Sequence, residues 1–280
     1  MVTHRSYSQE TADPPNTTLP TMYDLPSEDL NEPGLPDEFH DIQPQLLSRT
    51  LRVAEYSADQ IFCGSDLNLY YDPVKNGYKR PDWFTVLGVP RLYAGEEMRS
   101  SYVIWQEKVL PAVVVEFLSG GTERDDLGPY AESATTGKPL LPKPAPLSVD
   151  DAPPSKWHVY EHILKIPNYV VYSRFTHRLR YFRHLDGRFQ EQPLSQANPL
   201  IWIPEMNLGL GFWSGEFEGV ERLWLRWCDA DGNWVPTDTE QERQRAESAE
   251  AQLAEERRQR EQLLAKLREQ GIDPDELLRE

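Results

Sequence analysis

Residues 112–118 read AVVVEFL and carry the strongest strand signal in the chain. Apolar β-formers occupy both faces of this run, a pattern typical of a strand that is covered on both sides. Glu116 interrupts the run, and a glutamate is almost never fully buried without a partner. The stretch therefore predicts an interior strand of a sheet with one carboxylate that needs a partner.

The chain upstream of this strand predicts a helix and two further strands. An apolar face around residues 42–56 indicates an amphipathic helix. The run 61–71 alternates apolar and polar residues in its second half and indicates a strand. Residues 78–86 indicate another strand, with Pro81-Asp82 in its middle. Because proline cannot donate to a strand ladder, we expect that strand to lie at an edge or to end there.

Downstream, a long irregular insertion precedes a second helix. Residues 128–154 contain seven prolines, and loops of this length are usually functional lids or disordered. Residues 156–165 then fit a helix, and Ser155 is a natural N-cap for it. The residues expected to face inward from this helix are Trp157, Tyr160, Ile163 and Leu164.

The remaining strands complete the predicted architecture. Residues 168–172 and 178–183 indicate two strands, and residues 200–235 indicate aromatic-rich antiparallel strands. The order of helix, three strands, helix and further strands predicts an α/β fold, with a mixed β-sheet flanked by helices and a charged helix at the C-terminal end.

Charge divides the chain into three segments. The whole chain has 46 Asp and Glu residues against 29 Lys and Arg residues, a formal net charge of -17. Residues 1–40 hold eight acids, one base and six prolines, and residues 238–280 hold thirteen acids and eight bases. Residues 41–237 contain all eight tryptophans and a net charge of only -5. We therefore expect a disordered acidic arm, one folded domain and a charged helix or coiled coil.

Composition excludes several classes of protein. Cys63 and Cys228 are the only cysteines, which excludes a disulfide scaffold and a cysteine-based zinc site. No stretch approaches the roughly 18–20 apolar residues that span a membrane, and the polar first ten residues predict a cytoplasmic protein. The acidity argues against broad coating of nucleic acid, but most of it lies in the two outer segments.

The tail leaves two interpretations open. Residues 239–270 consist almost entirely of good helix formers. Ala246, Ala249, Leu253, Leu263 and Leu267 follow an a/d heptad, which is interrupted at Glu256, Arg260 and Gln270. The segment is either a coiled coil that joins two copies into a homodimer or a solitary helix held by i,i+4 ion pairs.

Three residues form the candidate site. Asp82 ends a predicted strand, Glu116 interrupts another, and Lys156 opens a helix. Two carboxylates from neighbouring strands suit a hard divalent cation such as Mg²⁺, which prefers oxygen ligands. A nearby lysine can neutralise the charge that develops on a phosphoryl group. Taken alone, Asp82 at a strand end could also be a turn former, and Lys156 at a helix start could simply be solvated.

The chain resembles the PD-(D/E)XK nuclease core, and within it the Uma-two family of restriction endonuclease-like proteins, a family expanded in cyanobacteria. The order of a helix, a strand, a strand with Pro-Asp, a strand with Glu and a helix carries the general resemblance. The specific resemblance covers roughly residues 40–237 and rests on the stretches 64–71 (GSDLNLYY), 81–90 (PDWFTVLGVP), 115–119 (VEFLS), 156–164 (KWHVYEHIL), 166–172 (IPNYVVY) and 208–213 (LGLGFW).

The resemblance implies a role for each matched residue. It implies that Asp82 and Glu116 bind Mg²⁺ or Mn²⁺. The nuclease pattern places its lysine two residues after the glutamate, where this chain has Leu118. The family usually supplies the lysine from the following helix, ahead of a tyrosine, and Lys156 and Tyr160 match that arrangement on one helical face.

Three more carboxylates are near the candidate site in the sequence. Asp66, on the first strand, is an additional candidate ligand, with a structural role in the sheet as the alternative. Asp125 and Asp126 follow the Glu116 strand closely, and they either approach the site or cap a helix.

DNA is the expected partner. Arg178 and Arg180 share one face of a predicted strand and are candidate phosphate contacts, with a solvated sheet face as the alternative. The sequence and the resemblance together predict a metal-dependent endonuclease that hydrolyses DNA phosphodiester bonds. The alternative is a catalytically inactive nuclease fold that acts as an interaction module through its C-terminal helix.

Overall fold

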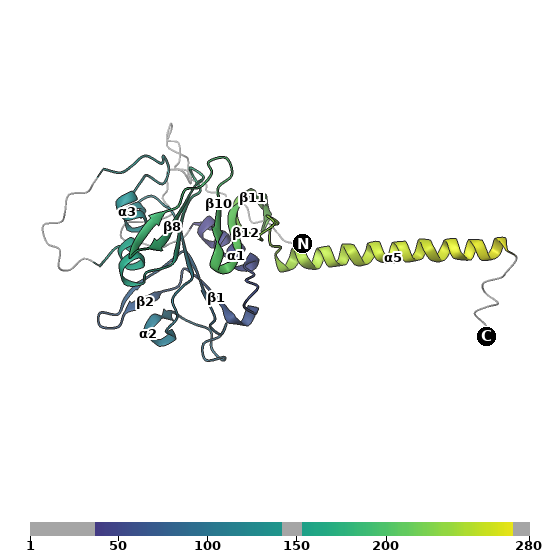
Figure 1. Ribbon diagram of the computed structural model, residues 1–280, viewed down its shortest axis with the longest axis horizontal. Helices are drawn as coiled ribbons and strands as arrows, with labels where there is room; N and C mark the ends of the chain where they lie inside the picture. Colours follow the sequence, from purple (N-terminus) through teal and green to yellow (C-terminus); the bar gives the residue numbers. More distant parts are fainter. Residues whose placement is uncertain (1–36, 142–152, 271–280) are drawn as a thin grey trace, which may run out of the picture. The chain divides into compact units, whose positions relative to one another are not determined.

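The predicted interior strand forms as β6 (Val113–Phe117), and all five of its residues are buried. The computed structural model describes residues 37–141 and 153–270. In it, β6 lies inside a six-stranded mixed sheet of order β1-β4-β6-β7-β8-β9. Figure 1 labels β1 and β8 of this sheet. Only β6 and β7 of this sheet run parallel, and the α/β fold expected from the sequence is confirmed. The other strands are β1 (Ile61–Ser65), β4 (Trp83–Leu87), β7 (Asn168–Ser173), β8 (Arg178–Leu185) and β9 (Arg188–Glu191).

Two three-stranded sheets complete the described strands. One has the order β3-β2-β5 and the other β10-β11-β12. Their bounds are β2 (Leu69–Asp72), β3 (Gly77–Lys79), β5 (Tyr102–Val103), β10 (Leu200–Ile203), β11 (Leu208–Phe217) and β12 (Val220–Cys228). The antiparallel pairing of β10, β11 and β12 agrees with the prediction for residues 200–235.

Each of the two strands predicted upstream of β6 is broken in two. The run 61–71 forms β1 and β2, and the run 78–86 forms β3 and β4. Asp66 turns the chain between β1 and β2 with φ of 48°, and its backbone N–H donates to the carbonyls of Pro81 and Asp82. Pro81 therefore lies between strands, where its missing N–H costs no ladder bond. Of the two expected alternatives, the strand end is the one that the structure shows, because β3 ends at Lys79 and β4 begins at Trp83 inside the sheet, between β1 and β6.

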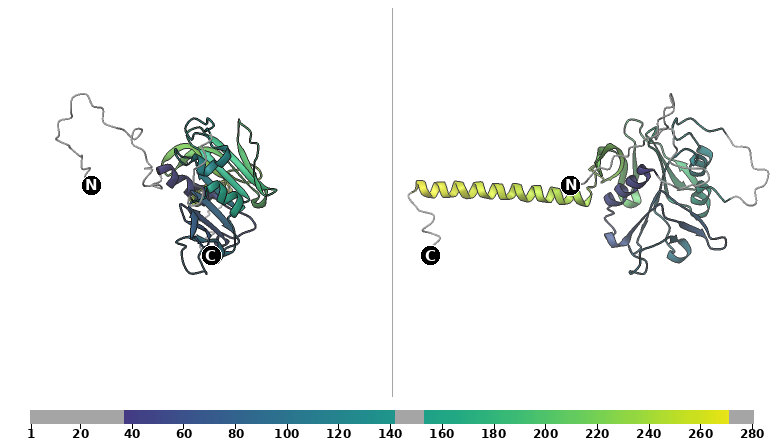
Figure 2. Two further views of the ribbon diagram at one scale, coloured as in Figure 1. Left: turned by 90° about the vertical axis from the view of Figure 1, so that its left-hand side faces the viewer. Right: turned by 180° about the vertical axis from the view of Figure 1, so that it is seen from behind.

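Helix α1 (Glu38–Thr50) occupies the position of the first predicted helix. It begins two residues before the expected end of the acidic arm, and residues 1–36 of that arm lie outside the described residues. Residues from Gln43 onward hold the helix against β12 of the β11–β12 pair: Gln43 exchanges hydrogen bonds with Leu225, and the Leu47 carbonyl accepts one from the Trp227 indole. Figure 2 shows α1, in purple, beside these strands in further views.

The crossover from β6 to β7 contains the elements that matter for the site. It includes α3 (Glu123–Leu127), η2 (Gly128–Tyr130), α4 (Lys156–His158) and the π-helical turn η3 (Val159–Ile163). Residues 142–152 of the proline-rich insertion lie outside the described residues. Short helical elements outside this crossover are η1 (Ala58–Gln60), α2 (Ile104–Glu107) and η4 (Pro204–Met206).

The second predicted helix forms, but with a change of pitch. The Ser155 side chain accepts a hydrogen bond from the His158 N–H, as expected of an N-cap. Trp157 and Tyr160 are buried, whereas Ile163 is 44% exposed and not inward as predicted. The π-helical turn adds a residue to the helical repeat, so the position that α-helical spacing assigns to the core rotates outward.

The C-terminal segment forms the long helix α5 (Asp238–Glu269). Thr237 and Glu240 make a capping box at its start, and Glu240 also pairs with the buried Arg226. None of its residues is buried, and Leu253 and Leu263 are among its exposed apolar side chains. Among the described helices, none has the length and apolar character needed to cross a membrane.

Candidate active site

Glu116 on β6 is the centre of the candidate site. Its side chain is fully buried, and both of its carboxylate oxygens accept hydrogen bonds. Tyr160 donates to Oε1 at 2.9 Å, and the Lys156 ammonium donates to Oε2 at 2.9 Å. Burial raises the pKa of Glu116 to about 8, and the neighbouring Asp82 adds to the rise, while Lys156 opposes it. The partner that a buried glutamate requires is therefore supplied by the following helical segment.

Asp82 lies opposite Glu116 because of the strand register. Trp83 pairs with Val115 across β4 and β6, so the next antiparallel position sets Asp82 across from Glu116. The Asp82 N–H donates to Glu116 Oε2 at 3.2 Å, and Asp82 Oδ2 accepts from the Phe117 N–H at 2.5 Å. Both carboxylates are thus held at one end of the central strands, and Asp82 stays partly exposed.

Lys156 reaches the site from the start of α4. Its Nζ lies 2.9 Å from Glu116 Oε2 and 3.4 Å from Asp126 Oδ1. Burial alone would lower the pKa of Lys156, but Asp126 and Glu116 together raise it well above its ordinary value. The charged form of Lys156 is therefore favoured in the site.

Asp125 and Asp126 make different contacts, and the sequence alone does not tell which of them caps the helix and which approaches the site. Asp125 Oδ1 accepts from the backbone N–H of Lys156 at 2.9 Å and lies 3.7 Å from the ammonium of Lys79. Asp126 is 1% exposed, and Thr122 Oγ1 donates to its Oδ2 at 2.6 Å. Burial raises the pKa of Asp126 to about 7. The first aspartate therefore caps the helix, and the second faces the lysine side chain.

Asp66 is not part of this cluster. Its carboxylate pairs with Arg80 at 2.7 Å, and both side chains are almost half exposed. Its contact with the site is made through its backbone, whose N–H donates to the Pro81 and Asp82 carbonyls. This geometry favours the structural alternative for Asp66, as a residue that shapes the turn before Asp82.

Arg178 and Arg180 lie on the same sheet face but in different surroundings. Arg180 is 5% exposed, and it donates from two nitrogens to Glu191 at 2.7 and 2.8 Å and from the third to the Tyr130 carbonyl. Arg178 has a half-exposed side chain that pairs with Glu132 at 2.5 Å. Arg180 is therefore engaged inside the protein, and Arg178 is the arginine of this pair that can reach a ligand.

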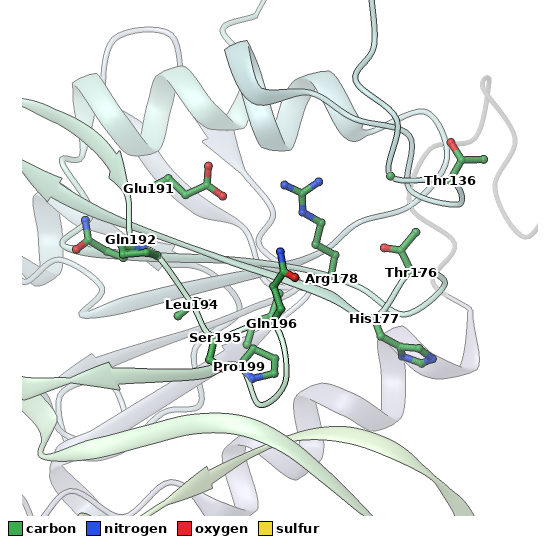
Figure 3. Close-up of a pocket in the computed structure, with 13 residues that line it drawn as sticks. Thr136, Thr176, His177, Arg178, Glu191, Gln192, Leu194, Ser195, Gln196 and Pro199 are labelled. Carbon is green, nitrogen blue, oxygen red and sulfur yellow. The ribbon is translucent and has the colours of Figure 1, made fainter.

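Arg178 lines a pocket of about 800 Å³. Figure 3 shows its guanidinium between Thr136 and Thr176 on one side and Gln192 and Gln196 on the other. Hydroxyl, amide and imidazole side chains line it together with two leucines and two prolines. Glu191 is the acid among the described lining residues, and Arg180 donates to both of its oxygens. The pocket thus offers hydrogen-bond donors at the edge of the central sheet.

The donor set fits a hard divalent cation held by few protein ligands. Within residues 37–141 and 153–270, no group of three or more His, Cys, Asp and Glu side chains is arranged to hold a metal. Mg²⁺ does not require one, because it keeps several waters and is usually bound by one or two carboxylates and substrate phosphates. Glu116 and Asp126 are buried carboxyls with raised pKa values, and Lys156 is the one ammonium between them. A divalent cation beside Asp82 and Glu116 would favour the ionised form of these carboxyls, which burial disfavours for Glu116.

A mixed sheet that presents Asp82 and Glu116 side by side, with a lysine reaching them from the next helix, defines a restriction-endonuclease-like nuclease fold. The Uma2 family model, described as "Putative restriction endonuclease", matches residues 17–215. Because this match covers well over half of the chain, the protein belongs to the Uma2 family. Comparisons with curated proteins and with solved structures found no match.

Proposed function

We propose that this protein is a Mg²⁺- or Mn²⁺-dependent endonuclease that hydrolyses DNA phosphodiester bonds. The observation that carries the proposal is the convergence of Asp82, Glu116 and Lys156, with the lysine ammonium 2.9 Å from the Glu116 carboxylate. Asp82 directly precedes β4, Glu116 lies in β6 and Lys156 opens α4, and their contacts are direct side-chain and backbone hydrogen bonds. Their roles as metal ligands and catalytic lysine are part of the proposal.

Asp82 and Glu116 would hold the metal through their carboxylate oxygens. When bound there, the metal supplies Lewis-acid stabilisation of the phosphoryl group and lowers the pKa of a coordinated water. Tyr160 donates to Glu116 Oε1 and so fixes the orientation of that carboxylate. The Phe117 N–H does the same for Asp82 Oδ2. The Asp82 and Glu116 carboxylates are therefore oriented by groups of this chain before metal or substrate binds.

Lys156 would neutralise the negative charge that develops on the phosphoryl group. Water attacks phosphorus, the bond to one bridging oxygen breaks, and the developing charge is spread over the phosphoryl oxygens. Because Asp126 and Glu116 raise the pKa of Lys156, its ammonium keeps its proton through this step. The lysine thus acts as a fixed cation beside the scissile phosphate.

The pocket beside β8 supports DNA as the substrate. Arg178 is our proposed phosphate contact, and the neighbouring hydroxyls and amides can donate to phosphate and sugar oxygens. Arg180 supports this surface indirectly, because it holds Glu191 and the Tyr130 carbonyl. The net charge of residues 41–237, -5, is small enough for a local contact of this kind.

A plasmid-nicking assay tests the proposed function. Wild-type protein with Mg²⁺ or Mn²⁺ should convert supercoiled plasmid to open circles, and Asp82→Ala combined with Glu116→Ala should not. Asp186→Asn, in the turn after β8, is the matched control and should cut like wild type. If wild type nicks no faster than the double variant, the enzyme proposal is wrong, and an interaction module on a nuclease fold becomes the better explanation.

Helix α5 supports a second proposal, that two copies of the chain associate through residues 239–270. Leu253 is 48% exposed and Leu263 is 60% exposed, which is unfavourable for a helix that stays alone in water. The molar mass of the full chain in solution tests this proposal. A dimer that becomes a monomer in Leu253→Lys/Leu263→Lys supports it, and a monomeric wild type contradicts it.

A further inference from the structure

Asp126 is a buried carboxylate with one oxygen that the fold leaves without a hydrogen bond. Within the described residues, Oδ1 of Asp126 has no hydrogen-bond donor, although the side chain is almost completely buried. Thr122 fixes the other oxygen at 2.6 Å and so orients the carboxylate. Leaving a buried carboxylate oxygen unsatisfied is costly, which calls for a reason why Oδ1 is placed there.

The nearest charged partner of that oxygen is the Lys156 ammonium. Nζ lies 3.4 Å from Asp126 Oδ1, just beyond the 2.9 Å hydrogen bond that it makes to Glu116 Oε2. An ammonium has three donors, and a small rotation of the lysine side chain exchanges one carboxylate for the other. The ammonium therefore lies between Glu116, to which it donates a hydrogen bond, and Asp126, whose oxygen is slightly farther away.

Glu116, which accepts the hydrogen bond from the Lys156 ammonium, is a proposed metal ligand. Glu116 Oε2 already accepts from Lys156 and from the Asp82 N–H, and Oε1 accepts from Tyr160. A divalent cation on Glu116 would repel the ammonium that shares this carboxylate, because like charges at such distances destabilise each other. Lys156 must then leave the Glu116 oxygen and still remain in the site.

We propose that Asp126 is the positioning residue that receives the Lys156 ammonium when a metal binds Glu116. The inference rests on the proposed function, since it concerns the same metal ligands and the same lysine. Asp125 and Asp126 then fix the backbone and the side chain of Lys156, respectively. Asp125 accepts a hydrogen bond from the Lys156 backbone N–H at 2.9 Å, and Asp126 pairs with its ammonium. A lysine supplied by a helix needs such an anchor, because no strand register places its ammonium beside Glu116.

Calorimetric titration with Mn²⁺ tests this role without reference to cleavage. Asp126→Asn keeps the shape of the side chain but offers the ammonium no second carboxylate, so Lys156 stays on Glu116 and competes with the metal. We expect Mn²⁺ affinity to fall by about tenfold or more, as for other residues that orient metal ligands. Thr122→Val, which releases the Asp126 carboxylate, should change the affinity in the same direction by less.

A double-mutant cycle separates positioning from a structural effect. In a Lys156→Met background no ammonium competes for Glu116, so adding Asp126→Asn should leave Mn²⁺ affinity unchanged. A loss that persists in that background overturns the inference, because Asp126 would then act on the metal or on the fold. Equal affinities of wild type and Asp126→Asn also overturn it.

A control variant and a separate assay complete the test. Glu161→Gln changes a buried carboxylate in the same helical segment, whose partners include Trp157, His162 and Phe189, and it should bind Mn²⁺ like wild type. Wild type that nicks plasmid while the cycle shows no coupling refutes the Asp126 role alone. Wild type that binds no Mn²⁺ and cuts nothing refutes the proposed function, and the role of Asp126 falls with it.

Discussion

The Lys156 ammonium lies 2.9 Å from the Glu116 carboxylate, although 40 residues and a proline-rich insertion separate the two in sequence. Glu116 is fixed by the middle strand of a sheet, whereas Lys156 is fixed by the cap of a short helix. The strand that carries the glutamate therefore does not need to carry the lysine as well. Leu118, at the position two residues after the glutamate, is instead free to pack into the core, where it is buried.

Replacement of this lysine should abolish cleavage without unfolding the protein. We expect Lys156→Met to lower the single-turnover nicking rate by roughly 10²-fold or more, the size expected for loss of a preorganised charge beside a transition state. Lys165→Met, an exposed lysine in the turn that follows η3, is the control and should keep the wild-type rate. Circular dichroism should show both variants folded. A Lys156→Met protein that cuts at the wild-type rate contradicts the proposed role of the lysine.

A divalent cation should stabilise the folded protein through Asp82 and Glu116. At about one hundred times the dissociation constant, Mn²⁺ should add about 2.7 kcal/mol to the free energy of unfolding. For a domain of this size, that corresponds to a Tm increase of roughly 5–10 °C. The increase should disappear with EDTA and in Glu116→Gln. An equal Tm increase in wild type and Glu116→Gln would place the metal elsewhere.

Without divalent cations, stability should fall as the pH rises. The pKa of Glu116 is raised from 4.5 to about 8 and that of Asp126 from 3.8 to about 7, so the folded state binds more protons than the unfolded state between these values. The stability due to each raised group is complete below its ordinary pKa and is lost as the pH passes its raised pKa. Each group contributes at most about 1.4 kcal/mol per pH unit.

Urea unfolding in EDTA between pH 5 and pH 9 measures this dependence. Glu116→Gln should remove the part of the slope that extends toward pH 8, and saturating Mn²⁺ should flatten the wild-type curve. A wild-type protein whose stability rises steadily over this range would contradict the burial of two protonated carboxyls.

Arg178 should contribute to DNA affinity mainly through phosphate. Arg178→Ala should weaken binding to all sequences alike and reduce the slope of log affinity against log salt by about one unit. Arg260→Ala removes the same charge from helix α5 and should leave both quantities unchanged. Fluorescence anisotropy with labelled duplexes at several salt concentrations provides the measurement. If the two variants behave alike, the pocket beside β8 does not contact DNA.

Arg180 should behave differently from Arg178, although both were candidates for the same role. Its guanidinium is buried and engaged by Glu191 and Tyr130, so Arg180→Ala should destabilise the fold, by about 3 kcal/mol, before it affects DNA. Equilibrium unfolding of the two variants separates these effects. A fully stable Arg180→Ala protein with weakened DNA binding would indicate that Arg180 contacts DNA directly.

The sequence predicted the main sheet well and the details around the site less well. The strand with Glu116 was readable because its burial on both faces leaves a continuous apolar run. The break of residues 61–71 depends on the positive φ of Asp66, which an aspartate adopts without any pattern in its neighbours. Ile163 was misplaced because the π-helical turn is set by tertiary packing and leaves the helical spacing of apolar residues unaltered in the sequence.

The candidate site shows the same division. Asp82, Glu116 and Lys156 were named from the sequence and a family resemblance, and the structure brings them together. Asp126 could be named only as one of two adjacent aspartates, since a five-residue helix gives no periodic signal for which side chain is buried. Long-range contacts, such as Asp125 with the Lys156 backbone, have no local signature at all.

The contacts of Asp125 and Asp126 with Lys156 also bear on how this protein can change. They join the residues just before the proline-rich insertion to the residue just after it, so the two ends of the insertion are held together by the site itself. For a segment closed in this way, doubling the number of residues costs only about 0.6 kcal/mol in chain entropy. The number of residues between Leu141 and Pro153 can therefore change while Asp82, Glu116 and Lys156 keep their mutual geometry.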